Sequence, residues 1–426
     1  MIPSRIHSRS DERQSSGVTG AETADIRAAM ALVEKLGRAL HAYGCPAHRL
    51  EDALAQVSQR LGLEGQFFST PTALFASFTV AGERSTSLSR VDPGEANLEK
   101  LAAIDAILGG VIRGGITAAE ASARIDELVA APPRYPVPLT TAAFALASGS
   151  SAHFFGGGWT EIAGASVIGL LVGLLALWAQ RSRANARLLE PLAAVTASFL
   201  ATVVLAIPGV PPASPFLVTL AGLIVLLPGL SLTVAMSELA TRHLVSGGSR
   251  LAGAALVFVT LGFGVALGGK LGEAVTGAAM AVTPTPLAPW TQLPALLVAA
   301  WSFTVLFRAR PRDFGWIFVA GAIALLGARV GAHWLGPELG ALVGAVLLGT
   351  GSNLYARRLD RPSATTQLPG LMLLVPGSLG FRGMAALLER DTLTGLQTAF
   401  SMTVVAIALV TGLLIANVVL PPRRSL

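Results

Sequence analysis

The sequence contains very little cysteine and, over most of its length, few charged residues. The single cysteine, Cys45, cannot form an intramolecular disulfide or supply a metal cluster. Only 13% of the residues are charged while 52% are hydrophobic, and the mean hydropathy is +0.63. These values lie far from those of soluble globular proteins, so we expect an integral membrane protein.

The chain also lacks the short motifs of several enzyme classes. It has no Walker loop, no dinucleotide-binding glycine motif, no paired-carboxylate glycosidase signature and no G-x-S-x-G turn. The six histidines are scattered, without the spacing of metal ligands. We therefore expect no metal, no cofactor and no catalytic residue, and this weighs against ATP-driven transport within the chain.

The charges are divided unevenly along the chain. Residues 1–138 hold 14 Lys/Arg and 16 Asp/Glu, a net charge of −2, whereas residues 139–426 hold 17 and 9, a net charge of +8. The excess positive charge lies in short loops between apolar segments, where it reports membrane topology. A nucleic-acid partner for the first part is therefore not expected.

The first 138 residues predict a small α+β domain. Residues 1–22 are polar, lack an apolar signal segment and predict a disordered leader, so the following domain stays in the cytoplasm. Residues 131–138 are proline-rich and predict a linker. Between them, residues 23–130 show helical spacing or short β-rich runs. The predicted helices are 23–40, 48–61, 98–112 and 118–128, and the predicted strands are 66–68, 73–80 and 85–91.

The remainder of the chain contains ten apolar stretches near membrane-spanning length. Arginines gather in every second loop between them, which places both termini in the cytoplasm and supports an even number of spans. The predicted fold is thus a polytopic α-helical membrane protein of about ten helices with an N-terminal α+β domain. The stretches are 139–156, 160–180, 188–207, 214–240, 251–271, 293–308, 314–334, 338–356, 368–388 and 394–420.

Two of these stretches share a Pro-Gly break followed by a serine. One runs LLPGLSLTVAMSELATRH (226–243) and the other LLVPGSLGFRGMAALLER (373–390). They are the fourth helices of two five-helix sets, 139–271 and 293–420, and an odd number of helices per set predicts two inverted repeats. In transporters of this plan, paired broken helices mark the substrate site.

The residues around the two breaks predict a site for a zwitterionic amino acid. Such a ligand needs one cationic and one anionic partner, and a helix break exposes backbone N–H and C=O groups beside them. The alternatives are that the breaks only kink packed helices and that the charges lie at a membrane interface. The candidate residues are Pro228, Gly229, Ser231, Thr233, Ser237, Glu238, Pro376, Gly377, Ser378 and Arg382.

Ionisable residues elsewhere give weaker hypotheses. Glu190 and Glu238 are candidate proton carriers, because a carboxylate within the bilayer is costly unless it has a role. Arg329 is interpreted as interfacial, or as a second cation for an anionic substrate. Cys45 lies between two histidines at a helix break, where a packing and turn role is favoured over a nucleophile.

Several segments together resemble the threonine/serine exporter family. They are LGRALHAYGCPAHRLEDALAQVSQRLGL, FFSTPTALFASF, VDPGEANLEKLAAIDAI, LPGLSLTVAMSELATRH with SGGSRLAGA, and LVPGSLGFRGM. The resemblance implies export of L-threonine and L-serine, driven by the proton motive force. In some relatives the two halves are separate subunits associated with dicarboxylate export, and a hydrolase-like activity has been suggested for the soluble domain; no catalytic role is transferred to Cys45.

The sequence thus predicts a secondary exporter, an antiporter of small polar amino acids and protons, rather than an enzyme. The alternatives are a succinate-like dicarboxylate exporter and a membrane-anchored sensor or hydrolase. The alanine-, glycine- and arginine-rich composition suggests a bacterial cytoplasmic membrane. The expected partners are threonine or serine, protons and the lipid bilayer, and a homo-oligomer is one option.

Overall fold

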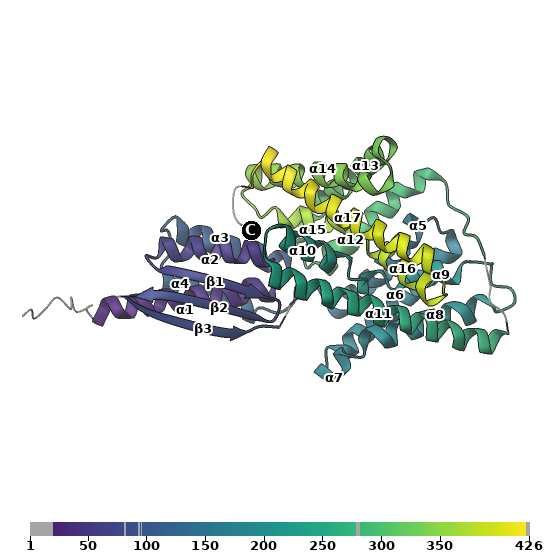
Figure 1. The fold of residues 1–426 in the computed structure, drawn as a ribbon, viewed down its shortest axis with the longest axis horizontal. Helices are drawn as coiled ribbons and strands as arrows, with labels where there is room; N and C mark the ends of the chain where they lie inside the picture. The colour runs from purple at the N-terminus through teal and green to yellow at the C-terminus, as the bar shows by residue number, and fades with distance from the viewer. Residues whose placement is uncertain (1–19, 81, 93, 95, 278–281, 423–426) are drawn as a thin grey trace, which may run out of the picture.

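The chain has two structurally distinct parts arranged along one long axis. The structure is a computed structural model that describes residues 20–80, 82–92, 94, 96–277 and 282–422. Residues 20–130, here called the N-terminal layer, lie at one end, and the helices of residues 137–422, the helical part, fill the rest (Figure 1). The predicted leader lies largely outside the described residues, but its last residues, from Gly20, already belong to the first helix.

The N-terminal layer contains four helices and one antiparallel sheet of order β1-β2-β3. Each element predicted from the sequence has a counterpart, and strand β1 is longer than expected. Thr117 closes a capping box with Glu120 at the start of the last helix, which explains that boundary. The elements are α1 (Gly20–Ala42), α2 (Ala47–Arg60), β1 (Glu64–Thr70), β2 (Ala73–Val80), β3 (Glu83–Arg90), α3 (Leu98–Ile112) and α4 (Ala118–Ala130).

The core of the N-terminal layer continues into the helical part. Leu74, Ala76 and Phe78, at every second position of β2, all point to its buried face and are almost fully buried. The same apolar cluster includes Ala300, Ala309 and Ile317 from the helical part. The two parts are therefore packed through a shared core rather than joined only by the connecting chain.

Every apolar stretch predicted from the sequence falls on one helix or one broken helix pair. One short helix, α7, was not predicted. The helices are α5 (Val137–Phe154), α6 (Trp159–Ala179), α7 (Arg183–Ala186), α8 (Leu189–Leu205), α9 (Pro215–Gly222), α10 (Gly229–Ala240), α11 (Leu244–Thr276), α12 (Gln292–Leu306), α13 (Phe314–Leu335), α14 (Pro337–Leu359), α15 (Ala364–Met372), α16 (Gly377–Leu388) and α17 (Thr392–Val419), with three 3₁₀ turns at Ile224–Leu226, Pro289–Thr291 and Pro311–Asp313.

Six helical segments among the described residues are long and apolar enough to cross a membrane, or seven if one bent pair is a single span. The bent pair, α9 with Ile224–Ala240, turns by 50°. The chain is thus a helical membrane protein. The predicted count of ten additionally requires α5, α8 and α12, which are shorter or less apolar than these segments.

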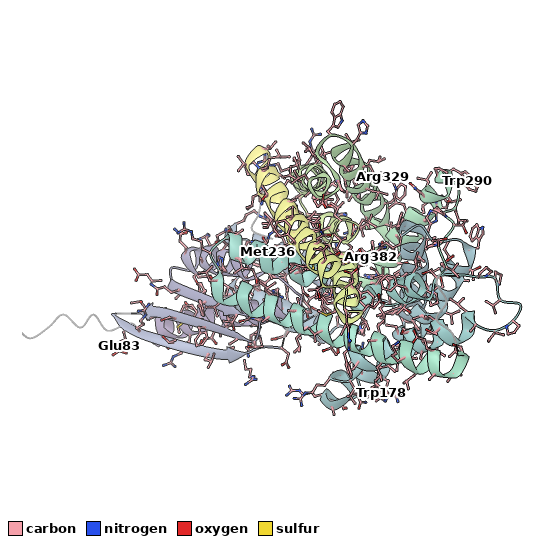
Figure 2. The ribbon with its side chains drawn as sticks, turned by 45° about the vertical axis from the view of Figure 1, so that its right-hand side comes forward. Glu83, Trp178, Met236, Trp290, Arg329 and Arg382 are labelled. Carbon is pink, nitrogen blue, oxygen red and sulfur yellow. The ribbon has the colours of Figure 1, made fainter. Side chains whose placement is uncertain are left out.

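Strongly exposed tryptophans lie near the ends of the helical segments at Trp159–Ala179, 289–306 and Phe314–Leu335. Helix α12 ends at the layer, because the Leu98 amide donates to the Phe307 carbonyl at 2.9 Å. Its other end therefore carries Trp290 away from the layer (Figure 2). Trp159, Trp290 and Trp334 are each at least 70% exposed. Exposed tryptophans at helix ends are typical of a membrane interface.

The broken helices repeat the same local geometry. Pro228 and Pro376 have nearly equal backbone angles, with φ near −80° and ψ of 36° and 27°. Each precedes a helix of 12 residues, and each helix leads to an arginine in the left-handed region, Arg242 with φ 66° and Arg390 with φ 67°. Such a position is uncommon for a residue other than glycine, so the two broken helices share an unusual local geometry.

The two broken helices cross at their glycines. A Cβ atom on Gly229 would lie 3.0 Å from the backbone nitrogen of Gly377, and one on Gly377 would lie 3.3 Å from the Cα of Gly229. Both glycines are buried. The absence of side chains at these two positions lets the backbones approach closely, as small residues do at helix contacts in membranes.

Replacing Gly229 with valine should destabilise this crossing. The added atoms meet backbone rather than a flexible side chain, so we expect a loss of about 1–3 kcal/mol in unfolding free energy. Gly248→Ala is the control, because nothing lies within 4 Å of its added Cβ. Alanine is also more favourable than glycine inside a helix, by about 1 kcal/mol. Thermal unfolding in one detergent measures both, and an unchanged midpoint for Gly229→Val would show that the crossing is loose.

Candidate functional site

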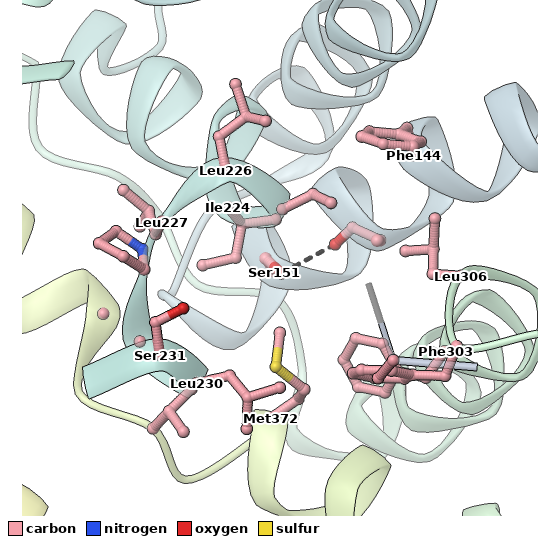
Figure 3. Close-up of a pocket in the computed structure, with 18 of the residues that line it drawn as sticks. Phe144, Ser151, Ile224, Leu226, Leu227, Leu230, Ser231, Phe303, Leu306 and Met372 are labelled. Atoms are coloured by element: carbon pink, nitrogen blue, oxygen red, sulfur yellow. Dashed lines mark hydrogen bonds between the residues drawn. The ribbon is translucent and has the colours of Figure 1, made fainter. Parts of the chain in front are cut away.

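A cavity of about 660 Å³ lies where the two broken helices cross. It extends from Gly94 and Ala96 of the N-terminal layer to the crossing itself. Figure 3 shows Leu226, Leu227 and Ser231 on one side and Phe144, Phe303 and Leu306 on the other. We call it the central cavity. Its mostly apolar wall and few polar groups are typical of small-molecule sites.

The central cavity is lined by charges of both signs. Glu190 at the start of α8, Arg308 after the end of α12 and the exposed Arg329 on α13 are among the residues that line it. The hydroxyl-bearing residues Ser231 and Ser378 line it beside the two breaks. Residues with acidic, basic and hydroxyl side chains thus line the same cavity.

The structure divides the residues predicted for the substrate site among several places. Pro228, Gly229, Ser231, Gly377 and Ser378 line the central cavity, and Pro376 is buried next to it. Glu190, predicted as a proton carrier, also lines it. The rest lie outside this wall, namely Thr233 and Ser237 in a smaller cavity against the N-terminal layer, Glu238 in a separate hydrogen-bond network, and Arg382 over the ring of Phe155 at 5.8 Å.

Glu238 joins the helical part to the N-terminal layer. Its side chain is fully buried, and its Oε1 accepts a hydrogen bond from the Ala47 amide at the start of α2, at 3.0 Å. Arg250 donates to both carboxylate oxygens at 3.1 and 3.2 Å, and the Ser246 hydroxyl donates to Oε2 at 3.0 Å. A helix N-terminus favours a carboxylate, so this contact satisfies both groups. The acceptor capacity of Glu238 is thus occupied by protein groups.

Histidines surround this joint. Nε2 of His243 lies 3.3 Å from the Glu51 carboxylate, and its ring lies 6.0 Å from that of His48. Burial, reinforced by the charges of Arg49 and His243, lowers the pKa of His48 to about 4. Burial also raises the pKa of the Cys45 thiol to about 12. A thiol held in this state is a poor nucleophile, in keeping with the packing role predicted for Cys45.

A second joint connects α3 to the end of α12. The amides of Leu98 and Glu99 donate to the carbonyls of Phe307 and Arg308 at 2.9 and 3.3 Å. The Tyr135 hydroxyl, in the predicted linker, donates to the Ala309 carbonyl at 2.6 Å. The linker is thus held against the helical part.

Among the buried carboxylates that the sequence reasoning missed, Glu161 and Asp313 lie at the starts of helices. Glu161 is 4% exposed and accepts from the amides of Gly158 and Ser214 at 2.9 and 3.1 Å, which ties α6 to the start of α9. Asp313 accepts from Arg361 at 2.6 Å. Both acids stand within the first residues of an apolar helix, and that capping pattern was the available signal.

Profiles of one family match almost the whole described chain. A profile described as a threonine/serine exporter matches residues 31–272, and a second, described as Threonine/Serine exporter, ThrE, matches residues 292–419. The chain belongs to the threonine/serine exporter family. This confirms the resemblance found in the sequence, and it indicates a transporter rather than an enzyme.

Several fungal membrane proteins are similar to this chain. The chain is 28% identical to pheromone-regulated membrane protein 10 of Eremothecium gossypii over 99% of its length and 60% of the relative. It is 29% identical to the protein of that name from Saccharomyces cerevisiae and 28% identical to that from Candida albicans, covering 88% and 89% of this chain and 49% and 35% of those relatives. The chain thus spans about a third to three fifths of these proteins. No solved structure matches it.

These relatives are named as membrane proteins, in agreement with the apolar helices. Because they come from fungi, they lend no support to the bacterial membrane expected from the composition. The matches identify no substrate, coupling ion or functional residue for this chain.

Glu238→Gln should loosen the contact between the N-terminal layer and α10. The substitution leaves Arg250 without a charged partner, and breaking a buried ion pair costs about 3–5 kcal/mol. We expect faster hydrogen exchange at the first amides of α2, measured on the full chain in nanodiscs. Glu83→Gln on exposed β3 is the control and should leave that exchange unchanged. Equal exchange in both variants would contradict a joint at Glu238.

Acid should destabilise the protein through His48. In the folded state its pKa is about 4, whereas the unfolded chain protonates near 6.5. The unfolded state therefore binds more protons between these values, so stability falls as the pH drops from 6.5 towards 4, by up to about 3 kcal/mol.

His48→Gln should remove this acid-dependent loss, which thermal unfolding midpoints between pH 4 and pH 7 would measure. His333→Gln, at an exposed position on α13, should retain the wild-type dependence. If His48→Gln were as acid-sensitive as the wild type, the loss would originate from another group.

Proposed function

We propose that this protein is a secondary exporter of small polar amino acids, L-threonine and L-serine, and that the central cavity is its substrate site. The observation that carries the proposal is the crossing of two repeated helix breaks beside a cavity with both acidic and basic walls. A zwitterionic amino acid requires charges of both signs, together with hydroxyl or backbone groups for its remaining polar atoms.

The proposed roles of the residues follow from their positions. Arg329 pairs with the substrate carboxylate, because guanidinium groups bind carboxylates through two parallel hydrogen bonds. Glu190 faces the ammonium group or carries the coupled proton. Ser231 and Ser378, next to the breaks, bind the substrate hydroxyl. Arg382 is a further cation near the wall through its contact with Phe155.

The membrane arrangement that we propose has ten spans in two inverted five-helix repeats. The equal geometry of the breaks at Pro228 and Pro376 supports the repeat. The arginine-rich loops lie at the end that carries the N-terminal layer, and by the positive-inside rule this end is cytoplasmic. The central cavity reaches Gly94 of that layer, so substrate would enter from the cytoplasm in exchange for protons.

A transport assay with paired variants tests this proposal. Cells loaded with serine- or threonine-containing dipeptides should release the amino acid faster when the protein is present. Arg329→Gln and Ser231→Ala should reduce that release, with roughly a 10-fold loss for the arginine, because an ionic hydrogen bond contributes about 1.5 kcal/mol or more. Arg181→Gln is the control, since this exposed arginine does not line the central cavity.

Two outcomes would contradict the proposal. Unchanged efflux in both cavity variants would remove the substrate site from the central cavity. Faster release of succinate than of serine would favour the dicarboxylate alternative, for which Arg308 and Arg329 are the cationic residues among those that line the cavity.

A further inference from the structure

A second cavity lies between the N-terminal layer and the broken helices. It has a volume of about 80 Å³ and is formed where α2, α10 and α15 meet. We call it the junction cavity and define it by Cys45, His48, Arg49, Thr233, Ser237 and Gln367. A cavity needs about 10–15 Å³ of volume to hold a single water, so this space is several times larger than that minimum.

Arg49 in this cavity lacks the type of partner that neighbouring arginines have. Among the described residues, its guanidinium makes two long hydrogen bonds to neutral groups, to the Ser363 hydroxyl at 3.4 Å and to Oε1 of Gln367 at 3.3 Å. Within the described part of the chain, no carboxylate pairs with it. By contrast, Arg250 pairs with Glu238 at 3.1 Å and Arg361 with Asp313 at 2.6 Å.

The surroundings make an unpaired cation costly at this position. Burial lowers the pKa of Arg49, because desolvation disfavours the charged form. A guanidinium in such surroundings is stabilised by a carboxylate that accepts two parallel hydrogen bonds. The geometry thus provides one half of an ion pair and lacks an anionic partner from the described residues.

The other groups that line the junction cavity indicate the chemical class of the anionic partner. The Nδ1 atom of His48 is buried without a hydrogen-bond partner among the described residues. The Ser237 side chain also lines the space. The remaining wall is apolar, with Leu101, Leu371 and Leu413. An apolar wall suits a short hydrocarbon body better than a strongly hydrated inorganic ion.

We infer that the junction cavity binds a small carboxylate, such as a hydroxy or amino acid of a few carbons, with Arg49 pairing with its carboxylate. This site is separate from the central cavity and does not depend on the function proposed for it. One wall belongs to α2 of the N-terminal layer and another to α10, which also carries Ser231 of the central cavity. The bound molecule therefore strengthens the contact between the layer and a broken helix.

Hydrogen exchange of residues 44–50 in the full-length protein in nanodiscs tests this inference. Acetate and L-serine serve as probes, with phosphate at equal concentration as the competing anion. Both carboxylates should slow exchange in the wild type and in Arg90→Gln, an exposed control on β3. At 100 times the dissociation constant the folded-to-unfolded ratio should rise about 100-fold.

Arg49→Gln should weaken the apparent affinity by roughly 30-fold or more, whereas Arg329→Gln in the central cavity should leave this protection intact. Arg49→Lys keeps the charge but loses the planar fork, so it should fold and still bind less tightly than the wild type. Protection of residues 44–50 that persists in both Arg49 variants would overturn the site. Equal protection by phosphate would overturn the carboxylate assignment.

Discussion

The close approach of Gly229 and Gly377 determines how the helical part is built. Two helices that stop and restart at a proline can pass each other only where neither carries a side chain, and their backbones here lie at van der Waals contact. Because each helix is interrupted at this point, some backbone N–H and C=O groups lack their usual intrahelical hydrogen-bond partners. These groups lie beside a cavity. The substrate site that we propose exists for this reason at the crossing and not elsewhere along the bundle.

The two halves are alike in their breaks but not in their external contacts. Glu238 on α10 accepts a hydrogen bond from the start of α2. The residue at the same distance from the break on α16 is Ala386, which has no carboxylate. In both helices the same backbone hydrogen bond closes the turn, from His243 to Glu238 at 2.8 Å and from Asp391 to Ala386 at 2.9 Å. A change in the N-terminal layer therefore acts directly on α10, and the similar geometry of the two breaks does not by itself distinguish α10 from α16 in this respect.

The sequence predicted the elements well because hydrophobic period and Pro-Gly punctuation are local signals. It also placed the paired breaks and the serines beside them. The sequence did not reveal that Glu238 contacts the N-terminal layer. A buried carboxylate that accepts a hydrogen bond from the Ala47 amide looks the same in sequence as one that faces a substrate. Glu190 and Arg329 share a cavity although they are far apart in the chain, and no local pattern reports that proximity.

The joint at Glu238 has a consequence for biosynthesis. The amide of Ala47 is satisfied by a residue 191 positions later in the chain, and the core beneath α1 and α2 includes Ile317. During translation the N-terminal layer leaves the ribosome before Glu238 and Ile317 have been synthesised. Until then its core lacks Ile317, and the Ala47 amide at the start of α2 lacks its carboxylate partner. Its final packing is then tied to insertion of the later helices, and a chain truncated before residue 238 would expose apolar surface to quality control.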